Sequence, residues 1–392
     1  MELDESQIRA VEVATSRRFS IINGGAGCGK TTIIRHITER LEGRGEQVAI
    51  CAFAGKAAAR IREATGHDAS TIHRLLQWEG TRFLLHDLSA YAVIIDEASM
   101  VNSRLLAEIV RRKPRRLVLV GDEAQLPPVG AGQPFHDLIR LRPQVVSSLT
   151  TCHRASEAIF RAASLIRTGQ QPCREERTSQ EHWAMLPTGG PRETHKAILD
   201  MVRRGELDFA QDIILSPRNE DESSAASAVS ALNRDIVQLV NPHPAGERLA
   251  AGDRVICGKN NAELDVWNGT TATVMAVDPS GRMQIRTDTE VVGQDGQRTN
   301  DVDVPADFAR NFSHAYALTV HKSQGSQYRR VIVICLQRDS FALLSRSLLY
   351  TAVTRARREC LVMGELRTFA DAITRVSGNS TVMQQLAALE RP

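Results

Sequence analysis

The chain has 392 residues, of which 42% are hydrophobic and 24% are charged. This composition is ordinary for a globular protein and excludes a mainly disordered chain, and the length favours two core domains with room for a small insertion. A net charge of +3 is too small to indicate a nucleic-acid partner by itself, and aromatic residues at 4% leave few rings for stacking on bases.

The sequence shows no targeting or membrane segment. The first residues, Met1 to Glu5, lack the basic and apolar regions of a signal peptide, and no apolar run approaches the ~20 residues that span a bilayer. We therefore expect a cytoplasmic protein. The seven cysteines contain no Cys-x-x-Cys pair, so we expect reduced residues in the core or in loops.

The first 150 residues alternate short apolar stretches with helical patterns. Strands are expected at 19–22, 48–52, 93–95 and 117–120. Such alternation predicts a parallel sheet wrapped by helices, and we take residues 1–150 as the first domain. A small interruption at about 75–90 predicts a hairpin that turns near Gly80.

A phosphate-binding loop follows the first expected strand, because residues 24–31 fit the pattern Gly-x-x-x-x-Gly-Lys-Thr. Glycines let backbone N–H groups close on phosphate oxygens, Lys30 reaches the β- and γ-phosphates, and the Thr31 hydroxyl is a ligand for Mg²⁺. A helix that begins at Lys30 adds a positive N-terminus. The predicted nucleotide contacts here are Gly24, Gly25, Ala26, Gly27, Cys28, Gly29, Lys30, Thr31 and Thr32.

Polar residues at other strand ends are predicted to complete this site. Asp96 would hold Mg²⁺ together with Thr31, and Glu97 would deprotonate the attacking water. Gln125 is a candidate sensor of the γ-phosphate, although its surroundings are equally typical of a turn. Gln7 would pair with adenine and favour ATP over GTP, although a surface glutamine is an equal alternative.

The later part of the chain predicts a second α/β domain over residues 151–392. It contains expected strands at 213–215, 317–320, 331–335 and 361–363, and expected helices near 155–167, 222–240 and 344–357. Between about 247 and 307, turn signals such as Asn268-Gly269 separate short β-prone stretches. We predict that 247–307 forms a small all-β barrel inserted into the second domain.

These blocks, in this order, resemble the superfamily 1 helicases, specifically the RecD-like and Dda-like branch that translocates 5′ to 3′. Further matching segments are 51–60, 71–75, 149–154, 317–326 and 350–357. The resemblance covers nearly the whole chain and implies an α/β fold of two RecA-like parallel-sheet domains, with ATP in the cleft between them and single-stranded DNA across their top. It also implies that 247–307 is an SH3-like domain and that the hairpin near Gly80 is a strand-separating pin.

The resemblance further implies roles for single residues. Arg154 and Arg355 would be arginine fingers on the γ-phosphate, which can be worth ~10³ to 10⁵ in rate; without the resemblance, Arg355 would belong to a basic helix face. Gly325 and Gln327 would lie near the nucleotide. The implied DNA contacts, each of which is singly as typical of a cap or core residue, are Gly55, Lys56, Thr71, His73, Phe83, Thr319 and His321.

Three segments depart from the family pattern or lack a role in it. Gln327 replaces the usual glutamate that touches the ribose, so sugar selectivity is open. His153 stands where tyrosine is common, so stacking on adenine is expected to be weaker. The basic run 111–116 is expected to be a solvated loop.

Our leading hypothesis is an ATP-dependent, 5′-to-3′ DNA helicase that uses ATP and Mg²⁺, acts as a monomer on single-stranded and forked duplex DNA, and has replication or repair proteins as partners. One alternative is a translocase that strips proteins from single strands and unwinds poorly. A second is a non-catalytic DNA-binding subunit of a larger repair or conjugation complex. An RNA substrate is disfavoured by the branch alone.

Overall fold

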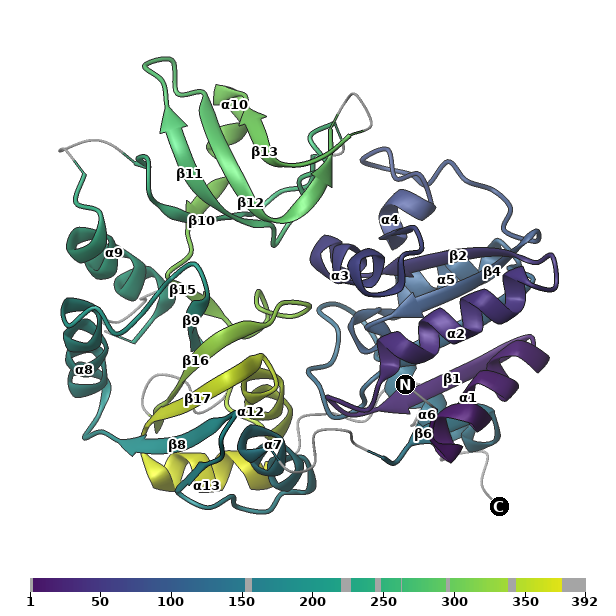
Figure 1. The fold of residues 1–392 in the computed structure, drawn as a ribbon, viewed down its shortest axis with the longest axis horizontal. Helices are drawn as coiled ribbons and strands as arrows, with labels where there is room; N and C mark the ends of the chain where they lie inside the picture. Colours follow the sequence, from purple (N-terminus) through teal and green to yellow (C-terminus); the bar gives the residue numbers. More distant parts are fainter. Residues whose placement is uncertain are drawn as a thin grey trace. The chain divides into compact units, whose positions relative to one another are not determined.

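The computed structural model describes residues 3–151, 157–219, 227–243, 248–261, 263–293, 297–337 and 343–375. The chain divides into two compact units, Met1–Ala155 with Ser377–Pro392, and Ser156–Val376. Figure 1 shows both units, with most of their helices and strands labelled. In the ranges given above, no helix combines the length and the apolar character that crossing a membrane requires.

The first unit is built on a six-stranded parallel sheet. Its strands run in the order β3-β2-β4-β5-β1-β6. Their bounds are β1 (Phe19–Gly24), β2 (Gln47–Ala52), β3 (Ala69–Thr71), β4 (Tyr91–Asp96), β5 (Arg116–Gly121) and β6 (Val146–Leu149). The predicted parallel sheet is therefore confirmed, and all its central strands end at one edge.

Helices cover both faces of this sheet. They are α1 (Glu5–Ser16), α2 (Lys30–Glu42), α3 (Gly55–Thr65), α4 (Ile72–Leu75), η1 (Ala98–Met100), α5 (Ser103–Arg111), α6 (Pro134–Leu141) and η2 (Pro143–Val145). Neighbouring residues of one strand face opposite sides, so Ile94 packs with α1, α2 and α3, whereas Val93 and Ile95 pack with α4, α5 and α6. Helix α2 contributes Ile33 and Ile37 at helical spacing.

The second unit contains another six-stranded sheet, in the order β15-β9-β16-β17-β8-β7, which is parallel except for the β7–β8 pair. Its strands are β7 (Glu175–Arg177), β8 (His182–Pro187), β9 (Asp212–Ser216), β15 (Ala317–Thr319), β16 (Tyr328–Cys335) and β17 (Ala356–Gly364). Its helices are α7 (Ala158–Thr168), α8 (Pro191–Arg203), α9 (Val229–Val240), α12 (Arg346–Val353) and α13 (Leu366–Thr374).

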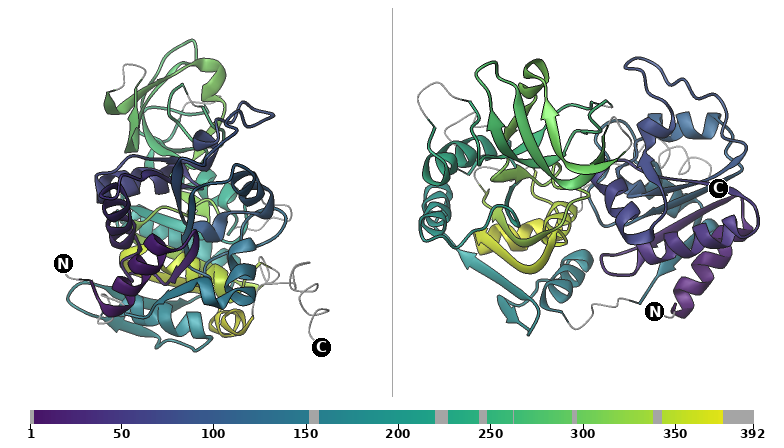
Figure 2. Two further views of the ribbon diagram at one scale, coloured as in Figure 1. Left: turned by 90° about the vertical axis from the view of Figure 1, so that its right-hand side faces the viewer. Right: turned by 45° about the horizontal axis from the view of Figure 1, so that its top comes forward.

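An antiparallel sheet is inserted between β9 and β15 and is drawn in green in Figures 1 and 2. Its five strands run in the order β13-β12-β11-β10-β14. The elements are β10 (Arg254–Cys257), β11 (Thr271–Val277), β12 (Met283–Val292), β13 (Arg298–Val304), α10 (Ala306–Ala309) and β14 (Phe312–His314). A core of its own includes Val255, Ile285 and Phe312. We call this part the inserted sheet.

Several sequence predictions of secondary structure need correction. The helix expected near 344–357 ends at Val353, because β17 begins at Ala356. No element was predicted for β7, β8 or α8. The cysteines in the described ranges are free, and all of them except the exposed Cys173 are buried.

Candidate active site

The phosphate-binding loop connects β1 to α2, as the sequence predicts. Gly27 and Gly29 have φ of 79° and 77°, a backbone conformation that favours glycine. The Lys30 ammonium folds back over the loop and donates to the carbonyls of Gly24 and Gly25 at 2.7 and 3.0 Å. A bound triphosphate would offer stronger, charged acceptors to the same ammonium.

The close packing of the loop depends on the first glycine. A side chain at Gly24 would place its Cβ 2.8 Å from Leu149 Cδ1, so no larger residue fits without movement. Thr31 and Thr32, both half-buried, lie in the first turn of α2. The loop therefore offers backbone N–H groups, one ammonium and a hydroxyl around one space, which is a donor set suited to phosphates and a hard cation.

Two carboxylates are buried at the end of β4. Asp96 is 1% exposed and Glu97 3% exposed, and Asp96 Oδ1 accepts the backbone N–H of Glu97 at 2.9 Å. Burial and then the Glu97 charge raise the pKa of Asp96 to about 6, while Arg60 and Lys30 act in the opposite direction. Lys30 affects the pKa of Asp96, so the ammonium predicted to bind phosphate and the carboxylate predicted to bind Mg²⁺ interact within one site.

Arg60 is a member of this site that sequence reasoning missed. It lies on α3, and its Nη2 is 3.7 Å from Glu97 Oε1. Glu97 itself has φ of 51°, which is uncommon for a residue with a side chain and is typical of strained positions in functional sites. Arg60 stands within a segment that matches the family, but nothing in the sequence relates it to Glu97.

Further polar residues gather at the end of β5. Gln125 is 3% exposed, and its Oε1 has no hydrogen-bond partner in the described part of the chain. Asp122 is fully buried and accepts the N–H of Ala124 at 3.0 Å. Asn23, which the sequence did not single out, accepts the N–H of Glu123 at 3.1 Å and so joins the ends of β1 and β5.

Gln7 lies against the phosphate-binding loop. Its Nε2 donates to the Cys28 carbonyl at 3.1 Å, and its Oε1 accepts the N–H of Asp4 in a capping box at the start of α1. Gln7 is 2% exposed, so the alternative of a surface glutamine is wrong. These contacts engage both ends of the Gln7 amide, which are the groups that would pair with adenine. Pairing with adenine therefore stays a prediction.

The residues implied as DNA contacts in the first unit cluster around the starts of α3 and α4. Gly55 and Lys56 form the first turn of α3, whose N-cap residue Ala54 provides no side-chain cap. Backbone N–H groups at such a helix start suit a phosphate. Thr71 caps α4 by accepting the N–H of Arg74 at 3.1 Å, which leaves its O–H as a donor.

A group of rings lies beside these helix starts, and we call Phe53, His73, Trp78 and Phe83 the aromatic cluster. The His73 ring centroid lies 6.4, 6.2 and 5.9 Å from those of Phe53, Trp78 and Phe83. Trp78 and Phe83 face each other across an antiparallel bridge, with centroids 4.5 Å apart, in a short hairpin with Gly80 at φ 88°. Burial lowers the pKa of His73, which favours the neutral form of its ring.

The basic run 111–116 is not simply a solvated loop, which corrects the sequence prediction. Arg112 is 8% exposed, packs its guanidinium 5.6 Å from the Phe83 ring centre, and donates to the Leu85 carbonyl and to Glu108. The buried guanidinium of Arg112 therefore holds the hairpin in place through Phe83 and Leu85. Arg116, also largely buried, lies 3.6 Å from Glu46.

In the second unit, the matching segment 317–326 leaves the end of β15. Thr319 Oγ1 accepts the N–H of Lys322 at 3.3 Å, and His321 is exposed. Gly325 is buried and has φ of 77°. Gln327 Oε1 accepts from Arg357 Nε at 3.2 Å, so this position holds a neutral amide where the family places a carboxylate.

Arg355 follows the end of α12 and is 3% exposed, so it does not belong to a basic helix face. Its guanidinium donates to the carbonyls of Thr351 and Ser326 at 3.0 and 3.3 Å, and to Thr354 Oγ1 at 3.3 Å. These contacts hold the Arg355 guanidinium between the segments 317–326 and 350–357. The other predicted arginine finger, Arg154, lies outside the described residues.

Comparisons with protein families place both units. Residues 2–184 match the family model described as an AAA domain, and residues 314–363 match the UvrD-like helicase C-terminal domain. The ATP-dependent RecD2 DNA helicase of Deinococcus radiodurans is 30% identical over 98% of this chain and 53% of its own length. The RecBCD enzyme subunit RecD of Mycobacterium tuberculosis is 32% identical over 95% of this chain and 71% of its own length.

A solved structure of Pif1 helicases at forked DNA resembles this chain in fold. The TM-score is 0.59 at 19% identity, over 100% of this chain and 96% of that one. The chain spans about half the length of the RecD2 helicase and nearly three quarters of the RecD subunit. The α/β fold with a parallel-sheet nucleotide-binding domain is thus shared with this group of proteins.

Proposed function

Because the chain belongs to the RecD family of superfamily 1 helicases, we propose that it is an ATP-dependent helicase that moves 5′ to 3′ along single-stranded DNA and separates duplex DNA. The observation that carries the proposal is the buried Asp96–Glu97 pair beside the phosphate-binding loop and Lys30. Such a constellation suits hydrolysis of a triphosphate, and it argues against a non-catalytic subunit.

Hydrolysis would proceed by attack of a water oxygen on the γ-phosphorus. The bond to the oxygen that bridges the β- and γ-phosphates breaks, ADP leaves, and Glu97 accepts the proton of the water. Lys30 would exchange its carbonyl partners in the loop for phosphate oxygens. Gln125, whose Oε1 is buried without a partner in the described chain, would orient the water or sense the γ-phosphate.

Thr31 and Asp96 would hold Mg²⁺. A hydroxyl and a carboxylate beside the phosphates are ligands that this cation prefers, and the raised pKa of Asp96 reflects a buried charge that a cation would stabilise. When bound, Mg²⁺ neutralises charge on the phosphates. The residues of the chain bind the nucleotide, orient it and accept the proton.

Arg60 would couple strand binding to hydrolysis. The same helix carries Gly55 and Lys56 at its start, where the strand is expected, and Arg60 at the Glu97 carboxylate. A shift of α3 on strand binding would release or redirect Glu97. We therefore infer that the ion pair keeps hydrolysis slow in the absence of DNA.

Arg154 and Arg355 would act as arginine fingers on the γ-phosphate. The buried guanidinium of Arg355 is already held by hydrogen bonds, so little side-chain freedom would be lost when it engages a phosphate. Gly325 and Gln327 would contact the nucleotide in the same site. The two domains of the proposed helicase would be residues 1–150 and 151–392.

The strand would run over Gly55, Lys56, Thr71 and His73 in the first unit and over Thr319 and His321 in the second. Hydroxyls and backbone N–H groups contact phosphates without reading sequence, so little sequence preference is expected. The hairpin that carries Trp78 and Phe83 would be the strand-separating pin, and the inserted sheet would be the SH3-like domain. The chain would act as a monomer in the cytoplasm, in DNA repair, recombination or replication.

The test is ATP hydrolysis with and without single-stranded DNA, together with displacement of a labelled strand from a 5′-tailed duplex. The proposal expects stimulation by DNA and strand displacement, both lost in Lys30→Ala. Stimulated hydrolysis without displacement would favour a protein-stripping translocase, which the shortness of the hairpin at Trp78 and Phe83 makes the second candidate. Activity that survives in Lys30→Ala would contradict the proposed site.

A further inference from the structure

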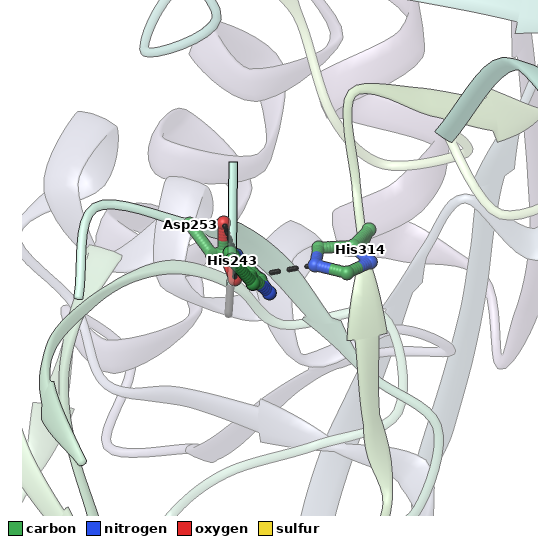
Figure 3. Close-up of side chains that lie close together, drawn as sticks. All are labelled: His243, Asp253 and His314. Carbon is green, nitrogen blue, oxygen red and sulfur yellow. Dashed lines mark hydrogen bonds and ion pairs between the residues drawn. The ribbon is translucent and has the colours of Figure 1, made fainter. Parts of the chain in front are cut away.

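Two histidines and an aspartate meet where the inserted sheet joins the parallel sheet of the second unit (Figure 3). His243 follows α9, Asp253 directly precedes β10, and His314 is the last residue of β14. The Asp253 side chain is fully buried, and that of His243 is 6% exposed. Segments distant in sequence thus converge on one buried carboxylate.

The three side chains present their ligand atoms to one another. His243 Nε2 lies 2.9 Å and His314 Nε2 lies 3.2 Å from Asp253 Oδ2, and one ligand atom from each residue lies within 4.8 Å of the others. A tetrahedral Zn²⁺ with bonds of about 2.0–2.1 Å separates neighbouring ligand atoms by about 3.3–3.4 Å. The two histidine–aspartate distances need only small outward shifts to reach that spacing, and the ligand atoms of the two histidines lie within 4.8 Å of each other.

Other groups fix the orientation of the carboxylate. Asn241 Nδ2 and the Tyr316 hydroxyl donate to Asp253 Oδ1 at 2.9 and 3.1 Å, and the Ala250 N–H donates to Oδ2 at 2.8 Å. Such backing of a ligand is characteristic of metal sites, where it orients the ligand and tunes its basicity. Burial by itself would raise the pKa of Asp253, but hydrogen bonds led by that of His314 outweigh burial and hold it well below its usual range.

We propose that His243, Asp253 and His314 form a site for a divalent transition-metal ion, and that Zn²⁺ is the ion that fits best. Two imidazoles and a carboxylate are a common donor set for zinc, and a fourth position would remain for water. The ion would accept the lone pairs of the two Nε2 atoms that now face the carboxylate, and each neutral ring would then carry its single proton on Nδ1. It would link Asp253 and His314, which lie at the two points where the chain enters and leaves the inserted sheet.

The experiment uses the full chain after removal of metals with a chelator. Zn²⁺ is titrated in competition with a chromogenic chelator, and Co²⁺ is added separately to record the visible absorption of a tetrahedral site. One ion should bind per chain, and His243→Ala or His314→Ala should each weaken binding by at least about 100-fold, since changes to supporting groups alone cost 10–100-fold.

His195→Ala is the matched control. His195 Nε2 lies 2.9 Å from Asp235 Oδ2 in the same unit, and within the described ranges this pair belongs to no group of three potential metal ligands. This variant should bind Zn²⁺ as the unmodified chain does. The thermal midpoint of the unmodified chain should rise with Zn²⁺.

Absence of stoichiometric Zn²⁺ binding to the unmodified chain would overturn the proposal and leave a purely hydrogen-bonded cluster. Equal binding in the unmodified chain and a His243→Ala/His314→Ala double variant would also overturn it. If a variant fails to fold, the Co²⁺ spectrum of the unmodified chain decides alone, because a spectrum without tetrahedral bands rules the site out. None of these readouts depends on helicase activity.

Discussion

Arg60 on α3 lies 3.7 Å from the carboxylate of Glu97, the proposed general base, within the first unit. The Arg60 side chain is 28% exposed and that of Glu97 only 4%, so the pair lies at the edge of the buried acidic site. Partial burial reduces solvent screening of such a pair relative to one on the surface. The contact therefore offers a direct mechanical link between a helix start suited to DNA phosphates and the residue that would activate water.

Arg60→Met tests that link. The substitution removes the Arg60 charge from Glu97, so ATP hydrolysis without DNA should rise about two- to five-fold, in line with roughly 0.5–1 kcal/mol for a partly exposed pair. Stimulation by single-stranded DNA should fall by a similar factor. The measurement is the steady-state rate of phosphate release with and without an oligonucleotide.

Arg62→Met on the same helix is the control. Its guanidinium donates to the Ala69 carbonyl at 2.7 Å instead of contacting Glu97. The ratio of stimulated to unstimulated hydrolysis should stay unchanged in this variant. An unchanged ratio in Arg60→Met would show that the ion pair does not couple strand binding to hydrolysis.

The pKa of Asp96, raised to about 6 chiefly by burial, predicts a pH dependence. Only the ionised carboxylate can hold Mg²⁺, so Mg²⁺-dependent nucleotide binding should weaken as the pH falls through about 6. An ordinary aspartate would keep its charge down to about pH 4. Binding of a fluorescent nucleotide analogue, measured with and without Mg²⁺ between about pH 5 and 8, checks this.

Arg60→Met extends the pH test. Arg60 lowers the pKa of Asp96, so its loss should move the acid limb of Mg²⁺-dependent binding to higher pH. A limb near pH 4 in the unmodified chain, or one that is the same without Mg²⁺, would refute the assignment of Asp96 as the ligand.

The pair of arginines that contact Glu108 predicts a difference in stability. Arg111 and Arg112 each lie 2.8 Å from a Glu108 oxygen, but their side chains are 72% and 9% exposed. Arg112→Ala should lower the free energy of unfolding by about 2 kcal/mol, because it removes a buried ion pair and the packing on Phe83. Arg111→Ala should change it by less than about 0.5 kcal/mol. Denaturant unfolding checks both, and equal losses would contradict the structural distinction.

The aromatic cluster predicts a separation of unwinding from hydrolysis. Trp78 is 38% exposed, at the exposed side of the hairpin, whereas Phe83 packs on Arg112. Trp78→Ala should reduce strand displacement several-fold while DNA-stimulated hydrolysis stays within about two-fold of the unmodified chain. Phe83→Ala should instead destabilise the unit, by about 2–3 kcal/mol. Full displacement by Trp78→Ala would argue against the hairpin as a pin.

The α/β class, the parallel sheet and the phosphate-binding loop could be predicted from the sequence because each has a strong local signal. Val93 to Ile95 form a continuous apolar run, as expected for a strand buried on both faces. The helix at Lys30 begins where the glycine pattern ends. The order of the matching segments also sufficed to identify the family, which the comparisons confirm.

Contacts between distant segments could not be predicted in this way. Arg60 and Glu97 meet only because β2 and β4 are neighbours in the sheet, and the three ligands of the proposed metal site meet only when the inserted sheet is formed. From the sequence, Arg112 is expected to be one exposed cation in a basic run. Only its packing in the structure shows that it is buried. The helical pattern predicts a helix up to residue 357, although β17 begins at Ala356, because periodicity does not mark where a helix ends and a strand begins.

The central claim is directional movement on DNA driven by the site around Lys30 and Glu97. The most direct measurement compares strand displacement on two duplexes that differ only in carrying a 5′ or a 3′ single-stranded tail, with ATP and Mg²⁺ present. We predict displacement from the 5′-tailed duplex alone, and none with Lys30→Ala. Displacement from the 3′-tailed duplex alone would contradict the account.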